Sequence, residues 1–162
     1  MPTRILVAYY TRTANTRAVA EAIQRHTGGD LAELRPVVPY PPSYQAVLKQ
    51  AQAEIKANAR PAIETLVEDP GAYGTVFVGS PIWWGTLAPP AATFLETQRL
   101  SGKTVVPFCS HGGGGAGHLE RDIAELCPTA LLLPALAVRG NGGATLESLI
   151  AAWLVKIGVT QG

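Results

Sequence analysis

The sequence has few of the residues that mark secreted or disulfide-rich proteins. Among its 162 residues there are only two cysteines, Cys109 and Cys127, and they lie 18 positions apart. This spacing matches no C-x-x-C motif, and two cysteines are too few for a disulfide framework. We therefore expect reduced thiols, as in a cytosolic protein, and no metal site.

An excess of charge of one sign is also lacking. Thirteen Lys or Arg face twelve Asp or Glu, which gives a formal net charge of +1 at pH 7. Such a balance provides no field that would attract nucleic acid or an acidic membrane surface. We expect neither as a partner.

Long apolar runs are missing as well. No run approaches the roughly 18 apolar residues of a membrane span. The N-terminus shows no charged segment followed by an apolar stretch of about 7 to 15 residues, so no signal peptide is expected. These absences predict a cytoplasmic location.

What the sequence does have is a regular alternation of branched apolar runs with amphipathic stretches. This pattern is typical of an α/β protein with a parallel sheet and helices on both faces. One domain over residues 1–162 is expected. Strands are predicted at residues 5–10, 31–35, 75–79, 104–109 and within 131–138, and helices at 16–27, between 44 and Pro61, at 90–97, at 118–126 and after a capping Thr145. Pro134 indicates an edge or a bulge in the last strand.

Ligands of such sheets bind beyond the carboxyl ends of the strands, at the point where the winding reverses. In the strand order 2-1-3-4-5, this rule selects the segments that follow strands one, three and four. They read T-R-T-A-N-T (11–16), S-P-I-W-W-G (80–85) and S-H-G-G-G-G-A-G (110–117). The site is expected between the first two, with the third beside them.

The first segment gathers hydroxyls and an amide directly before a helix. Together with the free N–H groups of that helix start, Thr and Asn side chains can form a cradle for a phosphate. Helix capping is the alternative, although a single polar residue suffices for a cap. Arg12 and Arg17 either contact the anion or point into solvent.

The second and third segments suit a flat ligand. Trp83 and Trp84 are consecutive, and one of them is expected to face an aromatic ligand, unless both cover the sheet edge. The glycines of 110–117 let the backbone approach such a ligand closely, unless they only make the loop flexible. Their match to a dinucleotide fingerprint is weak, because the segment follows the fourth strand and no acidic residue ends a strand about 20 positions later.

Taken together, Y-Y-T-R-T-A-N-T-R-x-V-A, G-S-P-I-W-W-G-T and P-F-C-S-H-G-G-G-G-A-G resemble the flavodoxin family, more narrowly the bacterial flavodoxin-like proteins with a P-I-W-W-G loop. The likeness spans nearly the whole chain, including P-Y-P-P-S-Y (39–44). It implies a flavodoxin-like three-layer sandwich, with a five-stranded parallel sheet in the order 2-1-3-4-5, that binds FMN non-covalently.

The resemblance also implies where FMN binds. The cofactor-binding residues carried over are Thr11, Arg12, Thr13, Ala14, Asn15, Thr16, Pro81, Ile82, Trp83, Trp84, Gly85, Ser110, His111, Gly112, Gly113, Gly114 and Gly117. Trp83 takes the place of the stacking tryptophan, and Trp84 is expected to pack more toward the protein. Trp84 and Gly85 take the place of the turn whose peptide can reorient toward flavin N5 on reduction. The sequence departs from the family in two places. Ala14 replaces the usual glycine, and because alanine disfavours a positive φ, none is expected there. The third segment lacks the tyrosine that often covers the outer face of the flavin.

Three functions stay open at this stage. The first is an FMN protein that shuttles electrons to a redox partner protein or a small-molecule acceptor. The second is an FMN oxidoreductase that reduces a quinone or similar acceptor with NAD(P)H. In it, His111 and His118 either donate a proton, bind the phosphate of the nicotinamide nucleotide, or are ordinary polar loop residues. The third is a ligand-binding module without redox function.

Because residues 11–17, 80–95 and 109–119 contain no Asp or Glu, two-electron reduction is expected to be more accessible than in acidic flavodoxins.

Overall fold

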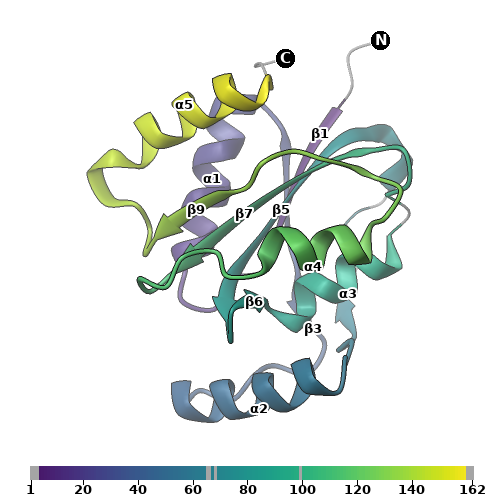
Figure 1. Cartoon of the computed structure of the whole chain (residues 1–162), viewed down its shortest axis with the longest axis vertical. Coiled ribbons are helices and arrows are strands. Elements are labelled where there is room, and N and C mark those ends of the chain that lie inside the picture. The colour runs from purple at the N-terminus through teal and green to yellow at the C-terminus, as the bar shows by residue number, and fades with distance from the viewer. Residues whose placement is uncertain (1–3, 65–66, 68, 99, 160–162) are drawn as a thin grey trace.

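The computed structural model describes residues 4–64, 67, 69–98 and 100–159, and it contains the predicted parallel sheet. Its order, β2-β1-β5-β7 followed by β8 and β9, is the expected 2-1-3-4-5 order with the last strand in two parts. Figure 1 shows β1, β5, β7 and β9 side by side. The strands are β1 (Arg4–Tyr9), β2 (Asp30–Glu33), β5 (Tyr73–Trp83), β7 (Thr104–His111), β8 (Leu131–Leu132) and β9 (Leu136–Arg139).

Helices cover both faces of this sheet, because successive residues of a strand point to opposite sides. In β1, Leu6 and Ala8 face one core, while Val7 and Tyr9 face the other. Two helices bury their apolar stripes against the second core: α1 (Asn15–Thr27) and α5 (Leu146–Ile157). Three lie on the first: α2 (Tyr44–Lys56), α3 (Pro89–Thr97) and α4 (Leu119–Leu126).

Pro134 divides the last strand, as the sequence predicts. β8 pairs with the start of β7 and β9 with its end, and the ladder is interrupted between them. The carbonyl of Pro134 accepts a hydrogen bond of 3.0 Å from the indole Nε1 of Trp153 in α5. The break therefore also anchors the last helix to the sheet.

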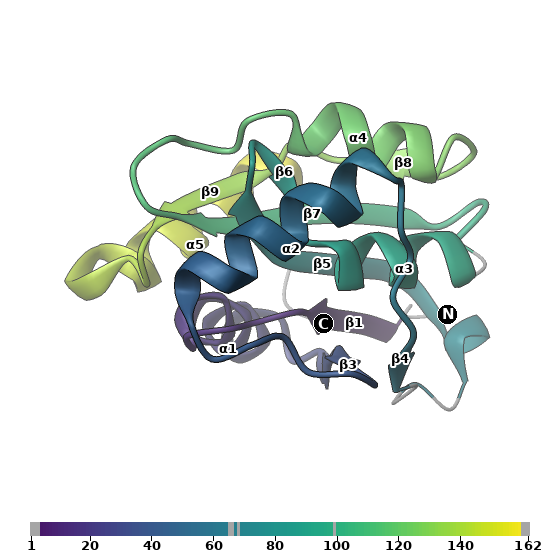
Figure 2. The ribbon, with the colours of Figure 1, turned by 90° about the horizontal axis from the view of Figure 1, so that it is seen from below.

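The second predicted strand, residues 31–35, is wrong in its extent. β2 ends at Glu33, and the chain then forms a separate antiparallel pair of β3 (Arg35–Pro36) with β4 (Ile63–Glu64). Pro36 has no N–H for the central sheet, which favours this departure. Between β3 and β4 the chain continues into α2, which lies beyond the carboxyl end of β5 (Figures 1 and 2).

The segment 80–85 was expected to be a loop, which is wrong for residues 80–83, whereas the turn expected at Trp84 and Gly85 is confirmed. β5 continues to Trp83, turns at Trp84 and Gly85, and pairs back with β6 (Thr86–Leu87). Both turn residues have positive φ, 55° and 79°, as in the type I′ turns that suit tight hairpins. Likewise, Ser110 and His111 belong to β7 rather than to the glycine loop.

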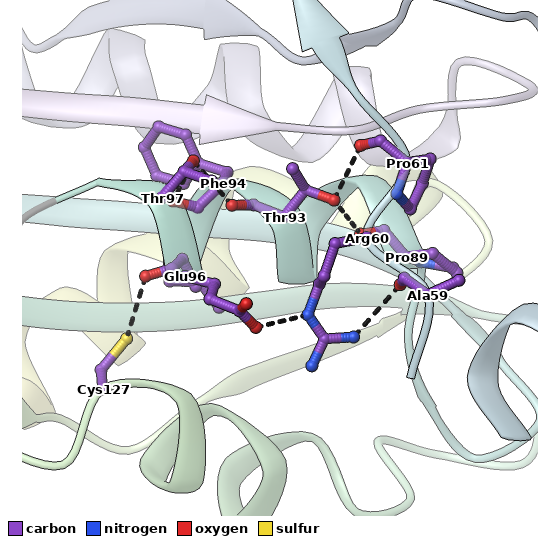
Figure 3. A network of polar contacts seen from close by, with 10 residues as sticks. Ala59, Arg60, Pro61, Pro89, Thr93, Phe94, Glu96, Thr97 and Cys127 are labelled. Carbon is purple, nitrogen blue, oxygen red and sulfur yellow. Dashed lines mark hydrogen bonds and ion pairs between the residues drawn. The ribbon is translucent and has the colours of Figure 1, made fainter. Parts of the chain in front are cut away.

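A network of polar contacts fixes α3 to the chain that leads into β4 (Figure 3). The Thr93 hydroxyl donates to the carbonyl of Pro61 at 2.8 Å, and Arg60 Nε donates to Glu96 Oε2 at 2.6 Å.

Both cysteines are buried and free, as expected. Burial raises the pKa of Cys109 to about 12 and that of Cys127 to about 11, so neither is a reactive thiolate near neutral pH.

One predicted helix end differs in detail from expectation, and another is confirmed. Thr145 occupies the N-cap of α5, but its hydroxyl donates to the Gly142 carbonyl and does not cap the helix. Gly28 ends α1 in the left-handed region at φ 74°, as a glycine after a helix should.

Within the part of the chain that the structure describes, no helix has the length and apolarity needed to cross a membrane.

Candidate functional site

A cavity of about 300 Å³ lies at the carboxyl ends of β1, β5 and β7. The three segments selected from the sequence all contribute to it. Its walls are formed by Arg12, Thr13, Asn15, Thr16, Tyr44, Pro81, Ile82, Trp83, Ser110, His111, Gly112, Arg139 and Gly140. We call it the strand-end cavity.

Ala14 gives the first segment an unexpected backbone conformation. It has φ 70° and ψ 1°, in the left-handed region, and stands at the N-cap of α1 without a capping side chain. The expectation that this alanine would do without a positive φ is wrong: the loop keeps the shape that a glycine would favour, at a cost of about 1 kcal/mol. Among the described residues, the amides of Asn15 and Thr16 form no hydrogen bond.

These amides are the unpaired donors at the start of a helix, where the macrodipole favours negative charge. The side chains beside them have different partners. Thr11 Oγ1 accepts a bond of 3.3 Å from the Arg17 amide, while Thr16 Oγ1 lies 2.7 Å from Ser110 Oγ in the interior. Thr13 is exposed at the cavity wall. The first segment thus combines free amides, a free hydroxyl and a buried link to β7.

Trp83 and Trp84 have opposite environments because one ends a strand and the other begins a turn. Trp83 is 3% exposed, lines the cavity and packs edge-on against Tyr10 and Tyr40. Trp84 is 52% exposed, and its Nε1 donates to the carbonyl of Leu48 in α2 at 2.8 Å. The expectation that Trp84 packs more toward the protein is therefore wrong, since Trp83 is the buried one.

The glycine segment is held by two sets of contacts. His111 Nδ1 accepts hydrogen bonds from the amides of Gly113 and Gly115, at 3.0 and 3.2 Å. At the other end of the segment, a Cβ on Gly117 would lie 2.2 Å from the carbonyl oxygen of Gly85. Glycine is required there for close packing of the segment against the β5–β6 turn. The segment is therefore shaped by its own histidine and is more than a flexible connection.

The charges around the cavity are positive. Arg12 lies over the ring of Tyr44, 5.2 Å from its centroid, and donates to the carbonyl of Pro42 at 3.0 Å. Arg139 also lines the cavity, and within the part of the chain that the structure describes no Asp or Glu does. Arg17 neither lines the cavity nor points freely into solvent, because it forms a 2.7 Å ion pair with Glu33.

Not every predicted residue lines the cavity. Ten of the carried-over residues lie in its wall together with Tyr44, Arg139 and Gly140, whereas Thr11, Ala14, Trp84, Gly85, Gly113, Gly114 and Gly117 shape the segments around it. Tyr44 was visible in the sequence as the last residue of P-Y-P-P-S-Y, but no pattern connects α2 with the strand ends. Arg139 sits at the end of β9, and the rule that ligands bind at strand ends could have found it.

Comparisons with known proteins agree with this geometry. The family model described as Flavodoxin matches residues 4–157. The chain belongs to the flavodoxin family.

Solved structures support this membership. A Bacteroides eggerthii protein described as a flavoprotein is 34% identical, with a TM-score of 0.87 over 98% of this chain and all of that one. A Lactobacillus acidophilus flavoprotein, solved in complex with FMN, is 21% identical and shares the fold, with a TM-score of 0.73 over 94% of this chain and 99% of that one.

A curated relative extends the comparison to an enzyme. A Cupriavidus metallidurans protein named NAD(P)H dehydrogenase (quinone) is 28% identical over 161 residues, which cover 91% of this chain and 77% of that protein.

Proposed function

We propose that this flavodoxin-family protein binds FMN in the strand-end cavity and works as an electron-transfer protein. One observation carries the proposal: free helix-start amides, a buried tryptophan wall and a glycine-lined wall meet at the carboxyl ends of three neighbouring strands. An elongated ligand with a terminal phosphate and a flat ring requires these three features together.

The phosphate would bind at the first segment. The amides of Asn15 and Thr16 offer two donors at a helix start, Thr13 adds a hydroxyl, and the charge of Arg12 lies at the same wall. None of the described residues that line this region has a carboxylate to repel an anion. The donor set therefore suits a phosphate monoester.

The flavin ring would lie between the ends of β5 and β7. Trp83 offers an aromatic wall held by two tyrosines, and Gly112 leaves open space where a side chain would stand. Tyr44, reaching the cavity from α2, provides a ring in place of the tyrosine that the glycine segment lacks. Aromatic contacts of this kind add about 0.5 to 1.5 kcal/mol to the burial of a ring.

In this role FMN supplies the uptake and release of one or two electrons, and the chain supplies position and electrostatics. The partner is a redox protein or a small-molecule acceptor. The residues that set the redox behaviour are the cavity arginines, since a positive charge favours the added negative charge of the reduced ring.

A second candidate is an NAD(P)H-dependent FMN oxidoreductase acting on quinones or similar acceptors. A specific observation favours it: among the described residues, the cavity wall has Arg12 and Arg139 and no carboxylate, which supports two-electron reduction of the ring. The named activity of the Cupriavidus metallidurans relative points in the same direction.

One experiment tests the proposal and separates the two candidates. The purified protein, loaded with FMN, is mixed anaerobically with NADH or NADPH in the absence of any reductase, and the flavin absorbance is followed. An electron carrier stays yellow until a reductase is added, while an oxidoreductase is bleached directly by the nicotinamide. Failure to bind FMN at all would contradict both.

A further inference from the structure

A second cavity, of about 600 Å³, lies on the other side of the first segment. It is an open hollow lined by the end of β1, the strand β3, the segment 37–42 and Glu64 of β4, and we call it the proline-loop cavity. Only Arg12 and Thr13 belong to both cavities. The proline-loop cavity is therefore a neighbour of the strand-end cavity and no extension of it.

The proline-loop cavity contains a polar group that is free to bind a ligand. Tyr10 is only 4% exposed, it lines this cavity, and its hydroxyl has no hydrogen-bond partner among the described residues. Within the same residues, every fully buried side-chain nitrogen or oxygen is paired. The Tyr10 hydroxyl must therefore reach the surface, and the cavity is the place where it can do so.

The remaining walls are flat and apolar. Four prolines, at positions 36, 39, 41 and 42, line the cavity together with the ring of Tyr40. Tyr40 is held in place, because its hydroxyl donates to Glu54 at 2.6 Å and its ring packs edge-on against Trp83, with centroids 5.2 Å apart. Rigid rings and prolines lose little entropy when they bind an aromatic molecule.

The charged groups at the rim are mostly positive. Arg12 and Arg35 line the cavity, and Glu64 is the one carboxylate among its lining residues. Arg35 has a loose contact of 3.6 Å with Glu33, and its side chain is 58% exposed. Both guanidinium groups thus have donors left for an acidic group on a ligand.

We propose that the proline-loop cavity is a second ligand site, for a flat aromatic molecule that carries an acidic group. The ring lies among the prolines and Tyr40, an oxygen bonds to the Tyr10 hydroxyl, and the acid faces Arg35. The inference does not depend on FMN, because its residues stand apart from the strand-end cavity except at Arg12 and Thr13. Trp83, whose ring touches both Tyr10 and Tyr40, forms the partition between the two sites.

Isothermal titration of the full chain tests this proposal with naphthalene-2-sulfonate as the probe. Protein saturated with FMN and protein without FMN are titrated in parallel, so that binding at the strand-end cavity is distinguished from binding at the second site. Naphthalene-2-sulfonamide, of the same shape but without the charge, measures the contribution of the acid. We expect one sulfonate per chain in both states, and binding of the sulfonamide about tenfold weaker.

Two variants locate the probe. Tyr10→Phe removes only the free hydroxyl and should weaken binding about fivefold without loss of folding, while Arg35→Gln should weaken it about tenfold. Tyr44→Phe and Arg121→Gln are the matched controls outside this cavity and should leave the affinity unchanged. The proposal is overturned if FMN displaces the sulfonate, if Tyr10→Phe and Arg35→Gln bind it as the parent does, or if no binding is measured.

Discussion

The hydroxyls of Thr16 and Ser110 lie 2.7 Å apart in the interior and join the first turn of α1 to the end of β7. Thr16→Val leaves the Ser110 hydroxyl without this partner, so we expect the free energy of unfolding to fall by about 1 to 2 kcal/mol. Ser110→Ala should cost a similar amount. The double variant should cost clearly less than the sum, because the second change removes the group that the first left unpaired. Urea denaturation without flavin measures all three, and additive losses would show that the two hydroxyls act separately.

Ala14 stores strain that a glycine would relieve. Its φ of 70° is unfavourable for any residue with a Cβ, so Ala14→Gly should raise the stability by about 0.5 kcal/mol, after the larger entropy of glycine in the unfolded chain is subtracted. Ala18→Gly, one turn later in α1, is the matched control and should lower stability by about 1 kcal/mol. Thermal unfolding compares them, and equal losses in both variants would contradict the strained conformation at Ala14.

Gly117 is required by packing, and Gly114 is not. A Cβ at Gly117 meets the Gly85 carbonyl at 2.2 Å and needs φ 56°, whereas one at Gly114 meets nothing within 4 Å. Gly117→Ala should therefore lower the free energy of unfolding by about 2 kcal/mol or more, and Gly114→Ala should change it by less than about 0.5 kcal/mol. Chemical denaturation of the pair provides the comparison. Similar values for both would mean that the glycine segment does not pack against the β5–β6 turn.

The fold was predictable because its patterns are local. Apolar runs and helical periodicity identified the strands and helices, and the handedness of β-α-β connections leaves few orders for them. Pro134 marked the division of the last strand in advance. These features depend on residues that are neighbours in the sequence.

The details of the site were less predictable because they depend on packing between distant segments. Nothing near Tyr44 in the sequence indicates that α2 reaches the strand ends, and nothing near Arg17 indicates its pairing with Glu33. The positive φ of Ala14 could not be derived from a residue type that disfavours it. The turn at Trp84 and Gly85 was expected from the resemblance, but the pairing of β5 with β6 on either side of it was not, because Pro81 and the short segment 80–85 indicated a loop.

The positive charge of Arg139 should raise the reduction potential of bound FMN. A unit charge about 10 Å from the ring changes the energy of an added electron by about 1 kcal/mol at an effective dielectric of 30, and salt screening reduces this for an exposed side chain. Arg139→Gln should therefore make the reduction potential of bound FMN more negative by a few tens of millivolts. Arg17→Gln, whose charge is paired with Glu33, should change it less. Anaerobic titration against a reference dye measures both, and an equal shift in the two variants would remove the special role of Arg139.

The most direct test of the account compares three flavins that differ at the phosphate. Protein freed of flavin is titrated calorimetrically with FMN, riboflavin and FAD under the same conditions. The cradle formed by the amides of Asn15 and Thr16 predicts one FMN per chain, with riboflavin and FAD at least about 100-fold weaker, since two or more phosphate hydrogen bonds are lost or obstructed. Riboflavin binding as tightly as FMN, or no binding of FMN, would contradict the assignment of the strand-end cavity.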